Sequence, residues 1–172
     1  KGATYEVTSA RQLDLTAEVL RSTNEVEANA RIADRYAQQA VATERVRRLA
    51  VELAAGADTT FDKVQAIEAW LDRNVTYSID APLAPTDTDV VDDFLFESRV
   101  GWCEQIASSM TVLLREQGVP ARLATGFVPD SRDAVSGRYR VLENGAHAWT
   151  EVWFEGVGWV PFDPTAGIEV SG

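Results

Sequence analysis

The chain has 172 residues, of which 45% are hydrophobic, and it carries a formal net charge of −11 at pH 7. This length and hydrophobic content are typical of one globular domain with a substantial core and exclude a disordered chain. The acidic balance argues against nucleic acid as a partner, because phosphate binding needs clustered Lys and Arg, and it disfavours adsorption to an anionic membrane surface. The sequence has no run of about 18 apolar residues, so we expect neither a membrane-spanning helix nor a signal peptide in it.

The N-terminal quarter of the chain has a weak pattern. Residues 4–9 have strand propensity, and residues 22–41 are polar and rich in alanine, which indicates a partly helical linker. The chain opens on Lys1 and not on methionine, so we expect it to be a piece of a longer protein. We therefore predict an N-terminal extension over residues 1–41, the remnant of a preceding module, and one catalytic domain over residues 42–172.

Two helices with clear start and stop signals open this domain. Apolar residues at helical spacing predict a helix that begins at Thr43 and ends at Gly56. The next helix begins near Thr59, which stands with Asp62 at capping-box spacing, and it runs to about Asn74.

A short strand, a loop and a short helix follow. Residues 75–79 read as the strand and residues 80–89 as the loop, after which Asp89 caps a helix that extends to Leu95. The acids at positions 87, 89, 92 and 93 lack the spacing of a calcium-binding loop. We expect them to be solvated.

The third long helix carries the only cysteine of the chain, Cys103. An apolar face from Ile106 to Leu114 predicts a helix over residues 104–117, which Gly118 ends. Cys103 therefore lies at or just before the first turn. A helix N-terminus stabilises a thiolate and offers free N–H groups to an oxyanion.

Beyond Pro120 the period changes to that of strands. We predict four of them, over residues 121–128, 138–142, 146–154 and 158–162. A tight turn at residues 155–158 joins the last two as a hairpin. Helices followed by consecutive strands predict an α+β fold with an antiparallel sheet.

The hairpin brings the only histidine, His147, towards Asp163. Pairing across the turn places residues 147–149 opposite residues 162–164, so the carboxylate can orient the imidazole. A thiol, an imidazole and a carboxylate are the parts of a cysteine nucleophile site. Each also has an ordinary interpretation: the cysteine as a small buried side chain, the histidine as a packed or surface residue, and Asp-Pro-Thr as a turn. The three could also bind zinc, although their spacing matches no compact zinc motif.

Four motifs stand in order along residues 94–165. They are Gly-Trp-Cys-Glu-Gln at 101–105, Gly-Val-Pro-Ala-Arg-Leu-Ala-Thr-Gly-Phe at 118–127, His-Ala-Trp-Thr-Glu-Val-Trp-Phe at 147–154 and Gly-Trp-Val-Pro-Phe-Asp-Pro-Thr at 158–165. With these motifs, residues 94–165 closely resemble the transglutaminase-like superfamily. Within the superfamily the chain is most similar to bacterial membrane-anchored proteins, in which such a domain lies outside the cytoplasm.

The resemblance implies a papain-like core whose nucleophile stands at a helix N-terminus packed on an antiparallel sheet. It implies Cys103 as the nucleophile, His147 as the general base and acid, and Asp163 as the orienting carboxylate. It also implies an extracytoplasmic domain of a membrane-anchored bacterial protein. We expect Trp102, Gln105 and Trp149 to form the cleft wall or to bind substrate.

We expect no cofactor and no metal. We do not expect the calcium activation that the resemblance to animal transglutaminases would suggest, because the surrounding domains of those enzymes are missing and the sequence shows no calcium site.

The predicted function is cysteine-dependent acyl transfer on protein or peptide carboxamides through a thioester, by transamidation or deamidation. One alternative is a cysteine peptidase or amidase that acts on cell-wall or other peptides. Another is a non-catalytic binding module of the same fold. The sequence leaves open the acyl acceptor, the physiological substrate and the oligomeric state.

Overall fold

The computed structural model describes residues 15–23, 30–39, 41–129, 131–134, 136–142 and 145–166. The helices are α1 (Ala17–Ser22), α2 (Ala30–Tyr36), α3 (Glu44–Ala54), α4 (Thr60–Asn74), α5 (Val90–Asp93), the π-helical turn η1 (Phe94–Ser98) and α6 (Cys103–Glu116). The strands are β1 (Thr76–Tyr77), β2 (Val100–Gly101), β3 (Ala121–Phe127), β4 (Ser131–Arg132), β5 (Tyr139–Arg140), β6 (Ala146–Phe154) and β7 (Gly158–Phe162). The strand predicted over residues 4–9 lies outside the described residues.

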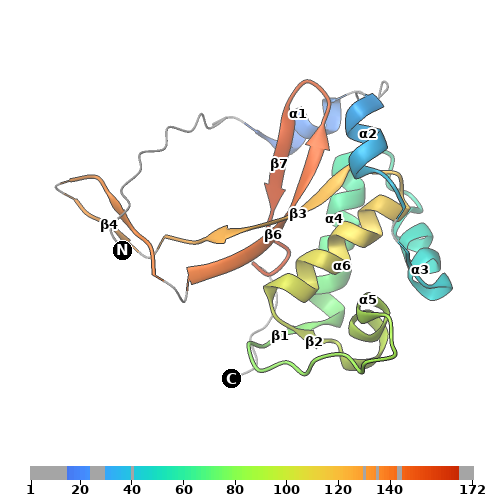
Figure 1. Cartoon of the computed structure of the whole chain (residues 1–172). Helices are drawn as coiled ribbons and strands as arrows, with labels where there is room; N and C mark the ends of the chain where they lie inside the picture. The colour runs from blue at the N-terminus through green and yellow to red at the C-terminus, as the bar shows by residue number, and fades with distance from the viewer. Residues whose placement is uncertain are drawn as a thin grey trace.

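Helix α6 lies at the centre of the fold and packs against β3, β6, α3 and α4 (Figure 1). The apolar face that predicted this helix is fully buried, including Ile106, Met110 and Leu114. Across it, Val152 and Phe154 of β6 are buried on the side of the sheet that faces the helices. The molecule is therefore a mixed helix and sheet structure whose core lies between α6 and the sheet.

The main sheet has three antiparallel strands in the order β3-β6-β7. Trp153 pairs with Trp159 and Phe154 pairs with Gly158, so the predicted hairpin is confirmed. The register agrees with the expected one to within one residue, because Thr150 stands opposite Phe162 where Trp149 was expected. Along β6 buried residues alternate with partly exposed ones, as expected for a strand with one face on a core.

The helix caps predicted at Thr59 and Asp89 are confirmed, and Thr43 also caps a helix. The side chain of Thr43 accepts from the Val46 amide, and that of Thr59 accepts from the Asp62 amide at 3.1 Å. Asp89 accepts from the Asp92 amide at 2.9 Å and so starts α5. Because each cap satisfies an amide that the first turn leaves unpaired, these residues fix where the helices begin.

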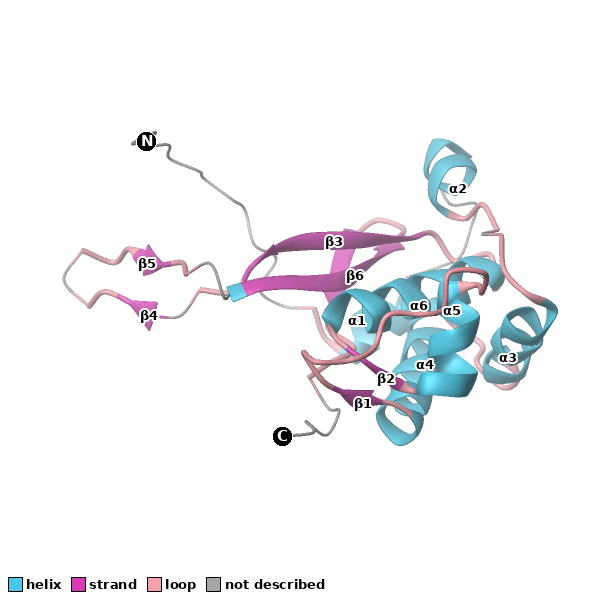
Figure 2. Ribbon diagram, turned by 60° about the horizontal axis from the view of Figure 1, so that its bottom comes forward, coloured by secondary structure: helices cyan, strands magenta, loops and turns pink. Residues whose placement is uncertain are grey.

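Two predictions about the strands and loops are wrong. The strand predicted over residues 138–142 is present as the two residues of β5, but it does not join the main sheet. Among the described residues it pairs with β4, and this exposed hairpin extends away from the core (Figure 2). Asp92 is not solvated: it is buried, and Arg45 of α3 donates to its carboxylate. Both outcomes depend on partners distant in sequence.

Three features were not predicted. Helix α1 buries Leu20, the turn η1 follows α5, and β1 forms a parallel pair with β2. In that pair Tyr77 stands opposite Gly101, two residues before Cys103. Among the described helices, none combines the length and the apolarity that a membrane crossing requires.

A buried polar contact joins α6 to β6. The Thr150 hydroxyl, which is fully buried, donates to the Ala107 carbonyl at 3.0 Å. The Thr111 hydroxyl donates to the same carbonyl at 2.8 Å and lies 3.3 Å from the Thr150 hydroxyl. Since buried hydroxyls without partners are costly, this contact sets the position of the helix along the strand.

Replacing Thr150 with valine keeps the side-chain shape and removes the hydroxyl. We expect the Thr150→Val variant to lose about 1 kcal/mol of unfolding free energy, the typical net contribution of one buried hydrogen bond. Urea unfolding measures it. The same change at the exposed Thr125 of β3 is the matched control, expected within about 0.5 kcal/mol of the parent. An equal effect in both variants would contradict the assignment.

Candidate active site

Cys103 is the first residue of α6, and its side chain is partly exposed. The helix begins there because the Gln105 side chain accepts from the Trp102 amide at 3.1 Å. The first amides of a helix have no partner within it. The thiol therefore stands beside a cluster of N–H donors at the positive end of the helix dipole.

The backbone that leads into α6 requires glycine at position 101. A Cβ there would lie 2.6 Å from Phe94 Cε2 and 2.8 Å from Gln105 Oε1. The parallel pair of β1 and β2 holds this glycine, because the Ser78 amide donates to the Gly101 carbonyl at 2.9 Å. The close packing at Gly101 therefore fixes the backbone that leads into α6 at Cys103.

His147 lies near the start of β6 and bonds to Asp163, which directly follows β7. Its Nε2 lies 2.8 Å from Asp163 Oδ2. Since Nε2 is engaged by the carboxylate, Nδ1 is the ring nitrogen left for a second partner. The predicted neighbourhood of these two residues is confirmed.

The Asp163 carboxylate is held by the turn that it begins. The Thr165 amide donates to Oδ1 at 3.0 Å, and the Thr165 hydroxyl donates to the same oxygen at 2.6 Å. Burial raises the pKa of Asp163, but the hydrogen bonds from Thr165 and His147 outweigh it, so that the pKa is lowered from 3.8. The carboxylate therefore stays charged at neutral pH. Asp-Pro-Thr is thus both a turn and the anchor of the carboxylate.

Cys103 and His147 line the same cavity, which has a volume of about 530 Å³. The remaining lining residues are Trp102, Glu104, Thr125, Gly126, Phe127, Ala146 and Ala148. An imidazole that shares a cavity with a thiol can activate the sulfur as a nucleophile. Here the other ring nitrogen, Nε2, is bonded to the carboxylate of Asp163.

The three residues expected in the cleft wall have different positions. Trp102 lines the cavity of Cys103, whereas Gln105 caps the helix beside it. Trp149 is not among the lining residues; its ring lies over Gly126, where a Cβ would come within 2.9 Å of the indole.

Two residues near the site were missed by the sequence analysis. Burial raises the pKa of Tyr77, and the negative charges of Cys103 and Asp163 raise it further, so the phenol lies within electrostatic reach of both. Glu68 of α4 lines a cavity with Asp163. Only the strand propensity around Tyr77 and the helical position of Glu68 were visible in the sequence, and neither pointed to this site.

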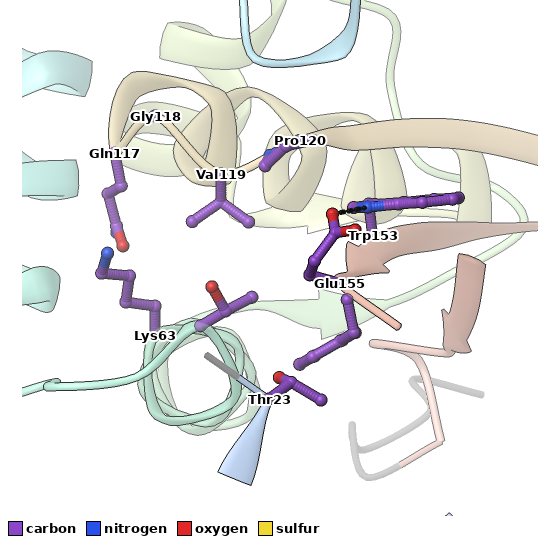
Figure 3. A pocket seen from close by; sticks show the side chains of 10 residues that line it. Thr23, Lys63, Gln117, Gly118, Val119, Pro120, Trp153 and Glu155 are labelled. Atoms are coloured by element: carbon purple, nitrogen blue, oxygen red, sulfur yellow. Dashed lines mark hydrogen bonds between the residues drawn. The ribbon is translucent and has the colours of Figure 1, made fainter. Parts of the chain in front are cut away.

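Another cavity, of about 250 Å³, opens at the opposite end of α6 (Figure 3). Lys63, Gln117 and Trp153 line it, with Glu155, whose carboxylate accepts from Trp153 Nε1 at 3.2 Å. A helix of this length spans roughly 20 Å, so the cavity is separate from the thiol site. Among the described residues, no group of three or more His, Cys, Asp or Glu side chains is arranged to hold a metal ion.

Comparison with known proteins shows relatives of this chain. It is 42% identical over 142 residues to the uncharacterized protein YebA of Bacillus subtilis (strain 168). The matched region covers 78% of this chain and 19% of YebA. It is 40% identical over 80 residues to a protein-glutamine gamma-glutamyltransferase of Pseudomonas aeruginosa. That matched region covers 46% of this chain and 12% of that enzyme.

The crystal structure of the periplasmic domain of TgpA from Pseudomonas aeruginosa, bound to ethylmercury, has a similar fold. It matches with a TM-score of 0.72 at 30% sequence identity, over 85% of this chain and 52% of that one. The papain-like fold expected from the sequence is thus confirmed.

The chain spans less than a fifth of the length of these two curated relatives. The family model of the transglutaminase-like superfamily matches residues 47–164, which is more than half of the chain. The chain belongs to the transglutaminase-like superfamily.

Proposed function

We propose that the chain is an acyltransferase that acts on side-chain carboxamides of protein or peptide substrates through a thioester on Cys103. The observation that carries the proposal is the cavity shared by the thiol and His147, whose ring is bonded to Asp163. The Pseudomonas aeruginosa relative named a protein-glutamine gamma-glutamyltransferase supports the choice of glutamine as donor.

In the first half-reaction the Cys103 thiol gives its proton to Nδ1 of His147, and the sulfur attacks the carboxamide carbon. The amide N–H groups at the mouth of α6 bind the oxyanion that forms. His147 returns the proton to the leaving nitrogen, so the carbon–nitrogen bond breaks and ammonia departs. Asp163 stabilises the imidazolium throughout, because it stays ionised beside Nε2.

In the second half-reaction an acceptor breaks the thioester. A primary amine gives transamidation and water gives deamidation, with His147 taking the proton of either nucleophile and returning it to the sulfur. Trp102 stands beside the thiol as an apolar wall, and such walls slow hydrolysis by excluding water.

We further propose that this domain works outside the cytoplasm as part of a membrane-anchored bacterial protein. The similarity to a periplasmic domain supports this placement. The chain covers less than a fifth of each curated relative, so the rest of such a protein has room for membrane-anchoring segments.

Thiol alkylation tests the activated nucleophile directly, because Cys103 is the only cysteine. We expect iodoacetamide to react with it several times faster at pH 7 than with free cysteine, because the thiol shares a cavity with His147. The His147→Ala variant should return the rate to that of a free thiol. A wild-type rate no higher than that of free cysteine would contradict the proposal.

The Cys103→Ala variant should lose all turnover, while its free energy of unfolding stays within about 1 kcal/mol of the parent. Ammonia release from glutamine peptides, with and without a primary amine, measures the activity. Ammonia with incorporated amine indicates transamidation, and ammonia with glutamate indicates deamidation. Cleavage of the peptide bond without ammonia would replace the proposal with a cysteine peptidase.

Glu68, which lines a cavity with Asp163, makes the free energy of unfolding depend on pH. Burial raises the pKa of Glu68 from 4.5 to about 7, and the charge of Asp163 adds to the shift. The unfolded chain loses this proton first, so the free energy of unfolding falls as pH rises from 4.5 to 7.

The Glu68→Gln variant cannot titrate there, and Gln65 can still donate to its side-chain oxygen. We expect its advantage in unfolding free energy over the parent to grow between pH 4.5 and 7 and then to level off. Urea unfolding at several pH values checks this. Glu52→Gln on the exposed face of α3 is the control, and a parallel pH dependence in both variants would argue against the buried acid.

A further inference from the structure

A second cavity, of about 460 Å³, adjoins the cavity of Cys103. Trp102 and Glu104 belong to the walls of both, so the two are separated only by the start of α6. The remaining lining residues are Leu83, Ala84, Val90, Val91, Gln105, Ser108 and Ser109. The wall of the second cavity therefore comes from the loop between β1 and α5, from α5 and from the first turns of α6.

The wall opposite α6 is apolar and open to solvent. Leu83 is 79% exposed and Val90 is 55% exposed, and both stand at this cavity with the indole of Trp102. Large apolar side chains left in water at one concave place mark a surface that becomes covered on binding. The hydroxyl of Ser109 is already bonded to the Gln105 carbonyl, so that polar group is satisfied without a ligand.

We infer that this cavity binds an apolar side chain of the acyl-donor peptide, within about two residues of the reactive glutamine. An extended peptide advances about 3.3 Å per residue, so a near neighbour of a carboxamide held at Cys103 reaches a cavity that shares a wall with it. The inference rests on the proposed function, because it assumes a peptide donor at the thiol.

The charge at the site adds a second element of selectivity. Glu104 is exposed on the wall common to both cavities, and Asp80 and Asp87 are exposed in the loop that also carries Leu83. Like charges repel, and the chain as a whole carries a net charge of −11. The occupant is thus apolar at the cavity, and the peptide around it is neutral or basic.

A panel of glutamine peptides tests the inference. All peptides have a background of glycine and serine. In each peptide, leucine, glutamate or glycine stands at one of the positions from two residues before to two residues after the glutamine. Leucine at one position should raise kcat/KM for ammonia release about tenfold over glycine, mainly through KM, as expected for a partly buried leucine. Glutamate at the same position should lower it.

Two substitutions locate the effect. Leu83→Ser and Val90→Ser should each bring the leucine-to-glycine ratio close to one, while kcat/KM for the all-glycine peptide changes by less than twofold. Val51→Ser is the matched control: Val51 is also an exposed valine, 68% accessible, but it lies on α3 and does not line either cavity. A ratio of one in the parent, or an unchanged ratio in both cavity variants, overturns the inference.

A second readout separates this inference from the proposed function. Peptides that carry a chloroacetamide in place of the glutamine side chain alkylate Cys103 without turnover. Faster alkylation by the leucine peptide, lost in Leu83→Ser, supports the cavity even if ammonia is never released. Ammonia release with equal alkylation rates for both peptides would leave the proposed function standing and reject the cavity. A leucine preference that survives in both variants assigns the apolar contact to another surface.

Discussion

The geometry of the site depends on one buried contact, the hydroxyl of Thr150 on the carbonyl of Ala107. Ala107 lies one turn after Cys103 in α6, and Thr150 lies three residues after His147 in β6. The two elements that carry the thiol and the imidazole are thus joined by a hydrogen bond within four residues of each group. Sliding the helix along the strand would leave the buried Thr150 hydroxyl unpaired, so this hydrogen bond and the apolar packing together set the register.

The second support comes from the ends of the elements. Asp163 follows the last residue of β7, and the Thr165 turn holds its carboxylate where the His147 ring can reach it. On the other side, the close contacts of Gly101 fix the entry into α6. Each reactive group therefore sits at the end of a packed helix or strand and not in a long loop, which is how a site keeps its geometry within fractions of an ångström.

The part of this arrangement that could be predicted from the sequence is the part set by local pattern. The apolar period and Gly118 predicted α6, and the 155–158 turn predicted the strand register that pairs Trp153 with Trp159. Contacts between distant segments could not be predicted. The partner of Asp92 is Arg45, 47 residues earlier, and the partner of β1 is another two-residue strand. Neither leaves a periodic signal, because too few residues take part in each.

The electrostatics of the cavity follow from the same residues. The residues that line it in the described part of the chain include no Lys or Arg, and Glu104 adds a negative charge next to Cys103. In the proposed mechanism, the positive potential at the sulfur would then come from the α6 dipole and from His147 once it has taken the thiol proton. A helix end supplies only about half a charge, so in the proposed mechanism most of the positive potential would come from the imidazolium. Asp163 matters to the proposed mechanism because its carboxylate stays ionised beside Nε2, where it can stabilise an imidazolium.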